Sequence, residues 1–282
     1  MIRLCQIAVF SCVFFLLTSC GAPEKTEPIW QHVKIGDIAP SRQTKRPAGR
    51  LLKTINLSVY TFEIPAENIT ALAEVWKILY TKPLRFNDYN AFKANSFSVG
   101  FGRTQTWNEI RNLLTAAGAG KAKTVSLLLL DGQANELAVT RVHSEQTIFY
   151  ISTDAAMEGA TIGPGKLALR IKAEKIPGSR GVSNVNVQPV FSPPVTSAIP
   201  QLAAREKAAN FPFDSVGFQL RMSPGDFILL APEKYISHQI TLGSLFFSKP
   251  QGRLFFSKTE RKPPERKPAV RIFLIACTGI ID

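Results

Sequence analysis

Alternation of apolar and polar positions begins at Ile55 and predicts a strand over residues 55–64. The apolar spacing then changes to three and four residues over 67–81, which predicts a helix with one apolar face. Alternation returns over 96–101 and predicts a second strand. The Thr-x-x-Glu spacing of Thr106–Glu109 predicts a capping box that opens a second helix, and Gly118 is expected to end that helix.

Three more strands are expected to complete this first region, over residues 125–130, 136–142 and 147–152. The predicted order over residues 54–152 is therefore strand, helix, strand, helix and three strands. That order is typical of a small α+β domain whose sheet has two helices on one side.

Beyond residue 152 the patterns indicate strands punctuated by proline and glycine, with one helix predicted from residue 200 to 210. The expected strands cover residues 166–173, 184–191, 216–222, 226–230, 240–247 and 269–277. Residues 153–282 are therefore predicted to form a mostly antiparallel β-rich domain, and the fold class predicted for the whole chain is α+β.

One short repeat lies in this second region. The sequence Leu-Phe-Phe-Ser-Lys occurs at 245–249 and again at 254–258. Nine residues are too few for a solenoid unit. The repeat predicts either a hairpin that pairs the two copies or a recent tandem duplication.

The N-terminus carries targeting information. Arg3 precedes a mostly apolar run from Leu4 to Leu17, which is too short to span a bilayer and is typical of a signal peptide. The run ends in Leu17–Cys20, read Leu-Thr-Ser-Cys, which resembles a bacterial lipobox. The alternative is an ordinary secretory signal with a chance cysteine.

The lipobox resemblance implies that residues 1–19 are a signal peptide, removed by cleavage before Cys20, and that the Cys20 thiol and the new amine are acylated. Two or three acyl chains would hold the chain on a membrane effectively permanently. Gly21 after the cysteine favours the outer membrane. Residues 20–53 are basic, polar and rich in proline, which predicts a flexible tether.

Cysteine usage leaves a single thiol in the folded part. Cys5 and Cys12 lie in the signal peptide, Cys20 is the predicted lipidation site, and Cys277 stands within an apolar run. We therefore expect no intramolecular disulfide, and we expect Cys277 to act as a small buried hydrophobe.

The 282-residue chain carries a net charge of +13, concentrated in the tether and around 249–267, without an aromatic RNA-binding motif. We therefore expect no specific nucleic-acid partner. Histidine occurs only at His32, His143 and His238, and no metal-ligand spacing or nucleophile elbow is present. The sequence thus predicts no catalytic residue, no metal and no cofactor.

Two late segments and the C-terminal strand resemble the core of secretins, the outer-membrane channels of secretion and pilus systems. These are Met222–Leu230, Leu242–Phe246 and Ala269–Ile281. In this chain Ala276–Gly279 stands where secretins have Thr-Pro-Arg, and no long amphipathic hairpin is present. The resemblance implies a periplasmic scaffold without the full pore.

The leading hypothesis is a non-enzymatic, lipid-anchored scaffold at the outer membrane, facing the periplasm. Its expected partners are membrane lipid through acylated Cys20, and either further copies of itself or secretion-system proteins. The alternative is a periplasmic ligand-binding lipoprotein with a pocket between the two predicted domains, lined by Trp76, Trp107 and Tyr150. A cell-envelope enzyme would require a cluster of carboxylates in one cleft.

Overall fold

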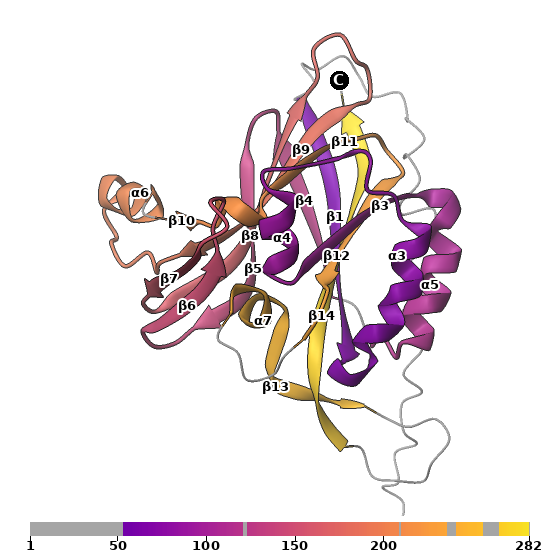
Figure 1. Cartoon of the computed structure of the whole chain (residues 1–282). Coiled ribbons are helices and arrows are strands. Elements are labelled where there is room, and N and C mark those ends of the chain that lie inside the picture. Colours follow the sequence, from indigo (N-terminus) through magenta and orange to yellow (C-terminus); the bar gives the residue numbers. More distant parts are fainter. Residues whose placement is uncertain (1–52, 121–122, 209, 236–240, 256–264, 282) are drawn as a thin grey trace, which may run out of the picture.

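The computed structural model describes residues 53–120, 123–208, 210–235, 241–255 and 265–281. Antiparallel strands dominate these residues and helices are the minority, as an α+β or mainly β class requires. The strands form two large sheets, A and B, and a two-stranded sheet C (Figure 1).

Sheet A is built around the two longest strands. Its order is β3 (Phe97–Arg103), β12 (Asp226–Pro232), β14 (Glu265–Ile281), β1 (Thr54–Pro65) and β4 (Lys123–Leu130), and β13 (Ser248–Phe255) also pairs with β14. β1 and β14 pair along their lengths, from Thr54 opposite Ile281 to Pro65 opposite Ala269. Most apolar residues of β1 are buried, and β14 is almost continuously buried from Ala269 to Cys277, as expected of a strand at the centre of a structure.

Sheet B has the order β2 (Leu84–Phe86), β11 (Phe218–Met222), β9 (Ser183–Ser192), β8 (Gly165–Lys175) and β5 (Ala134–Val142), with β10 (Phe211–Pro212) pairing β9. Its residues alternate between buried apolar and partly exposed polar positions along β8 and β9. That alternation is typical of a sheet with one face in the core and one towards solvent.

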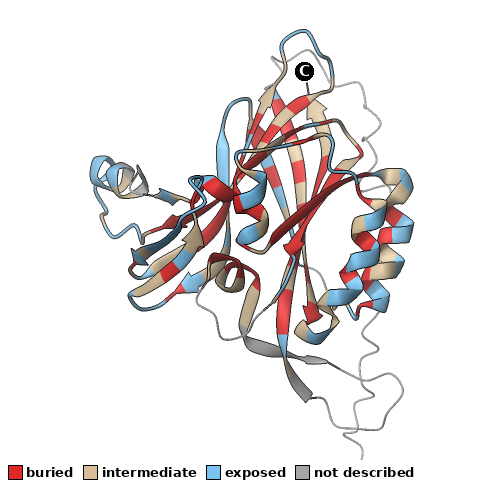
Figure 2. Ribbon diagram, in the orientation of Figure 1, coloured by how far each residue is buried: buried red, intermediate tan, exposed pale blue. Residues whose placement is uncertain are grey.

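The two large sheets share one hydrophobic core, which runs through the centre of the molecule (Figure 2). The chain passes between them at two tight turns. Residues 131–133 lead from β4 of sheet A to β5 of sheet B, and residues 223–225 lead from β11 of sheet B to β12 of sheet A. Gly225 adopts a φ of +94° in the second turn, a conformation that glycine tolerates without strain.

The sheet order corrects the predicted division of the chain. Sheet A joins β1, β3 and β4 from the region 54–152 to β12 and β14 from the region 153–282, and sheet B mixes the two regions in the same way. The boundary at residue 152 therefore does not separate two sheets or two cores. The reason is long-range pairing, because the first strand pairs with the last.

Two helices cover the outer face of sheet A: α3 (Leu72–Ile78), which follows a 3₁₀ turn at Ala66–Ala71, and α5 (Trp107–Ala116) (Figure 1). Glycine in β3 allows this close approach, because a Cβ on Gly100 would lie 2.6 Å from the Cβ of Leu79, which directly follows α3. The helix predicted over 67–81 is shorter than expected. It ends before Tyr80, whose backbone pairs with Phe101 of β3.

Of the two predictions for the ends of α5, one is wrong and the other is confirmed. The predicted capping box at its start is wrong, because the Thr106 hydroxyl donates to the Arg103 carbonyl instead of accepting from the helix. The predicted end is confirmed. Gly118 has a φ of +79°, and the Gly118 and Ala119 amides donate to Thr115 and Leu114, which is the Schellman arrangement.

The strand predicted over 240–247 is wrong. Residues Leu242–Phe247 form a short helix, α7, opened by a reciprocal capping box between Thr241 and Ser244. Phe246 and Phe247 pack against Phe273 of β14, so burial on more than one side replaces the expected alternation. The hairpin between the repeat copies is also wrong, because the first copy lies in α7 and β13 while Leu254 of the second copy pairs with Arg266.

Sheet C lies beside the body of the molecule, which sheets A and B form. Its strands are β6 (Gln146–Ile151) and β7 (Met157–Ile162), which form a hairpin on the same side of the molecule as β10 and α6 (Pro200–Ala208) (Figure 1). The sequence predicted β6 and α6 but not β7. The remaining helix, α4 (Tyr89–Ala94), is capped by Asp88 and leads into Asn95, which contacts the hairpin.

Candidate functional site

The residues singled out from sequence are not brought together. The predicted lipidation site Cys20, the lipobox and nearly all of the predicted tether lie outside the described residues. Trp76 is half-buried on α3, Trp107 is fully buried and packs edge-to-face on Phe227, and Tyr150 packs on Phe213. The three aromatic residues therefore do not line one pocket.

Trp76 does line a hollow beside α4. Its volume is about 60 Å³, enough for a few water molecules or one small chemical group. The walls are mostly aromatic and aliphatic, and the lining residues are Trp76, Leu79, Thr81, Phe86, Tyr89, Phe92, Lys93, Ser98, Val99 and Gly100. Two of the polar side chains there already have partners, since Lys93 Nζ donates to Ser98 Oγ at 3.0 Å and lies 3.4 Å from Glu233.

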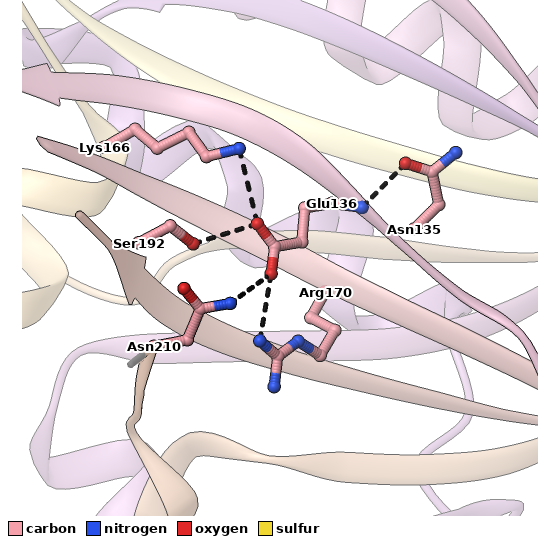
Figure 3. A network of polar contacts seen from close by, with 6 residues as sticks. All are labelled: Asn135, Glu136, Lys166, Arg170, Ser192 and Asn210. Atoms are coloured by element: carbon pink, nitrogen blue, oxygen red, sulfur yellow. Dashed lines mark hydrogen bonds and ion pairs between the residues drawn. The ribbon is translucent and has the colours of Figure 1, made fainter. Parts of the chain in front are cut away.

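The densest polar cluster is centred on Glu136 of β5, on the solvent-facing side of sheet B (Figure 3). One carboxylate oxygen accepts from Arg170 at 2.9 Å and from Asn210 at 2.7 Å. The other accepts from Ser192 at 2.9 Å and lies 3.3 Å from Lys166 Nζ. The cluster therefore joins β5, β8 and β9 to the segment between α6 and β10.

The charge of Glu136 is well compensated. Burial raises the pKa of its carboxyl, but the hydrogen bonds from Arg170, Ser192 and Lys166 outweigh burial and lower the pKa below its usual range. A carboxylate that accepts four donors and stays ionised is poorly suited to act as a general base. We interpret the cluster as a structural tie between strands.

Cys277 lies in β14, where both faces of sheet A are covered. It is fully buried, and burial is the main cause that raises the pKa of its thiol to about 12. A thiol with this pKa is protonated at neutral pH and is a poor nucleophile. The prediction of a small buried hydrophobe is confirmed. Within the described part of the chain, no cluster of three or more metal-ligating side chains occurs.

Exposed apolar side chains gather on the hairpin and the arm beside it. Met157 is 73% exposed and Phe149 is 45% exposed, both on sheet C. The arm, which we define as residues 193–212 with α6 and β10, adds four more: Val195, Ile199, Leu202 and Phe211. Exposed apolar groups that lie close together are typical of interaction surfaces.

The backbone contacts that hold the hairpin to the body are made by β6, while Ile162 of β7 is buried in the shared core. Asn95 Nδ2 donates to the Ile151 carbonyl and Asn95 Oδ1 accepts from the Ile151 amide, both at 2.8 Å. Phe149 also forms a parallel bridge with Thr241. β7 pairs with β6 on one side, and no other described strand pairs with it.

Sequence reasoning missed β7 because its six residues contain glycine, alanine and threonine and no sustained apolar alternation. The available signal was its position after β6, since residues 152–156 are a short polar connection of hairpin length. The free edge could not be read from the sequence, because an edge depends on which strands are absent beside it.

Comparison with known proteins gives no relative. No family model matches the chain, and neither a curated protein nor a solved structure matches it. Among the described residues, no helix is both long enough and apolar enough to cross a membrane.

Proposed function

We propose that this chain is a non-enzymatic, lipid-anchored protein of the bacterial cell envelope that serves as an assembly or interaction scaffold. Cys20 is the proposed anchor, with the outer membrane as the proposed location and the periplasm as the side that the folded part faces. The proposed partners are membrane lipid through Cys20, and further copies of the chain or secretion-system proteins through the folded part.

The observation that carries the scaffold role is the hairpin with its neighbouring arm. Six of the nine large apolar side chains that the described residues expose lie there, whereas the polar cluster at Glu136 has every acceptor occupied. A surface of this kind favours a macromolecular partner over chemistry on a small substrate. The anchor is supported separately, by the lipobox-like Leu17–Cys20.

The secretin-like relation is the more detailed form of this proposal. Its support is the sequence of Met222–Leu230, Leu242–Phe246 and Ala269–Ile281. These segments correspond to β11 with β12, to α7 and to β14, which contact one another in and beside sheet A. On this proposal the chain would pack into closed assemblies around a symmetry axis.

The test has two readouts on the full chain expressed in a Gram-negative host. Mass spectrometry of the N-terminal peptide and fractionation of Cys20→Ala against the wild type examine the anchor. We expect a diacyl or triacyl mass on Cys20 and release of the variant from the membrane fraction. An unmodified Cys20, or a variant that stays in the membrane, would overturn the anchor.

The scaffold role is examined by native mass spectrometry and negative-stain microscopy of the detergent-extracted chain. We expect one defined oligomer. A monomer at every concentration would overturn self-assembly and leave the secretion-system partner to be sought by crosslinking in the cell.

A ligand-binding lipoprotein is the second candidate, and the hollow beside Trp76 is the observation that favours it. The hollow holds only a small group, so a ligand would bind with one substituent inserted and the rest outside. Quenching of Trp76 fluorescence by a small-molecule library, compared with a Trp76→Phe variant, would reveal such binding.

A further inference from the structure

Backbone pairing in the hairpin determines which groups of β7 face outward. The Ser152 amide donates to the Ala156 carbonyl at 2.9 Å, and residues 146–151 pair with residues 162–157 in the same register. In an antiparallel pair, hydrogen-bonded and non-hydrogen-bonded residues alternate. The even residues of β7 therefore bond to β6, and Met157, Gly159 and Thr161 direct their amides and carbonyls away from it.

The odd residues of β6 have the same orientation, and the body uses them. Ile151 bonds Asn95 through both backbone groups, and Phe149 bridges Thr241. No such contact reaches β7 from the described residues. Met157, Glu158, Gly159 and Thr161 are all exposed, so the outer edge of β7 is open.

Three other sheet ends, β3, β2 and β5, differ from β7. Tyr80 exchanges two backbone hydrogen bonds of 2.8 Å with Phe101 and so covers part of β3, and β2 has only three residues. β5 carries a bulge between Ala138 and Thr140. Short strands, bulges and covering segments are how sheets avoid edge pairing. β7 has no proline, lysine or arginine and no bulge.

We propose that β7 is a self-pairing edge, on which a second copy of this chain adds its own β7 in antiparallel register centred on Gly159. This rests on the proposed scaffold function and names the partner and its geometry. Met157 then lies opposite Thr161 of the second copy, and Gly159 lies opposite its counterpart. Because residues 157, 159 and 161 all present free backbone groups, about six new hydrogen bonds form.

Side chains at the edge fit a copy of themselves. Phe149 pairs with Gly159, and a Cβ on Gly159 would lie 3.5 Å from the Phe149 ring, so the ring leans over the glycine towards the open edge. In the paired form the two Phe149 rings approach each other from either side of the glycine pair. Cross-strand aromatic contacts of this kind stabilise sheets.

Charge also favours this edge for self-association. The chain carries a net charge of +13, so two copies repel each other where their basic segments meet. Residues 146–162 contain no lysine or arginine, and their two acidic residues are Asp154 and Glu158. In the proposed register Glu158 lies opposite Ala160 of the second copy, so no like charges face each other directly.

The register can be tested by a charge exchange, with sedimentation velocity of the full mature chain over roughly a hundredfold concentration range. M157K/T161K places lysines opposite one another in both outer pairs, and we expect the dimer Kd to rise at least about tenfold. M157K/T161E places a lysine opposite a glutamate, and we expect the Kd to return to within about threefold of the wild type. Both positions are exposed, so the variants are expected to fold.

Leu128→Lys is the matched control. Leu128 is 67% exposed on β4, which lies at the end of sheet A, so the substitution adds a lysine beside a different edge. We expect it to leave the Kd unchanged.

An oligomer that M157K/T161K does not weaken, that M157K/T161E does not restore, or that Leu128→Lys weakens equally would overturn the β7 register and leave the scaffold proposal standing. A wild-type chain that stays monomeric would overturn both self-assembly and the β7 edge.

Discussion

The body formed by sheets A and B and the β6–β7 hairpin of sheet C are both antiparallel, but they are stabilised in different ways. In the body, central strands such as β14 have neighbours on both sides and buried side chains on both faces. In the hairpin, Ile148 and Ile162 are buried while Phe149 and Met157 on the other face are exposed. The central strands of the body thus pair on both sides within one chain, whereas the hairpin has a free edge and exposed apolar side chains available to a partner.

This difference indicates where to look for function in a chain without recognisable chemistry. Satisfied groups such as Glu136 maintain the fold, and an unsatisfied edge with exposed apolar side chains has a cost that a structural role does not explain.

The largest expected effect is in the body. Phe227→Ala removes a fully buried ring that packs edge-to-face on Trp107. We expect the free energy of unfolding to fall by about 3–5 kcal/mol, because the lost apolar contacts leave a cavity. Equilibrium urea unfolding measures this change.

Phe149→Ala in the hairpin is the matched control, measured at a dilution where the chain is monomeric. Its ring is 45% exposed, and we expect a change of at most about 0.5 kcal/mol. Equal losses for Phe227→Ala and Phe149→Ala would contradict the contrast between the two regions.

The junction between the regions gives the second prediction. Asn95→Ala removes both side-chain hydrogen bonds to the Ile151 backbone. We expect a loss of about 2 kcal/mol, since a buried pair of backbone groups is left without partners. Hydrogen exchange should accelerate in residues 146–162 and stay slow in β1 and β14.

Asn135→Ala is the control for the junction. Asn135 is exposed, and its side chain accepts only from the neighbouring Glu136 amide at 2.8 Å. We expect the free energy of unfolding to change by about 0.3 kcal/mol, with no effect on hydrogen exchange in the hairpin. Unchanged exchange of the hairpin in Asn95→Ala would show that other contacts hold it.

Local patterns predicted most individual strands but not how the strands combine. The alternation at residues 55–64 depends only on neighbouring residues, and β1 is found there. Its pairing with β14 crosses more than two hundred residues of sequence, and no local pattern specifies such a partner. β4 and β5 are adjacent in sequence and nevertheless enter different sheets, so a short connection does not show that two strands pair.

Helix α7 and the positions of the aromatic residues were also hard to predict, because both depend on contacts between distant parts of the chain. Leu242–Phe247 is mostly apolar, and helix and strand cannot be distinguished in a short apolar run by periodicity alone. The capping residues Thr241 and Ser244 were the local signal for the helix. Trp76, Trp107 and Tyr150 share an amino-acid class but not a location, because aromatic side chains fill cores more often than they line pockets.

The smallest expected effect is at the polar cluster on sheet B. Glu136→Gln keeps the size of the side chain and removes its charge, and we expect a loss of about 1 kcal/mol at neutral pH. The pKa of Glu136 is lowered in the folded chain, because hydrogen bonds from Arg170, Ser192 and Lys166 outweigh burial, which acts to raise it. The stabilisation is therefore complete above the ordinary pKa of 4.5 and is lost as the pH falls through the lower pKa of the folded state.

Unfolding of wild type and variant should accordingly converge on acidification, and urea titrations at several pH values from neutral to acidic measure this. Glu174→Gln on the same strand pair is the control, because Glu174 bonds Lys172 with both side chains nearly half exposed. Such exposed pairs contribute little, so we expect a change of about 0.3 kcal/mol with a flat pH dependence. If the effect of Glu136→Gln were equally small and independent of pH, the cluster would not tie the strands together. The solvent-facing side of sheet B would then become a second surface to examine for partners.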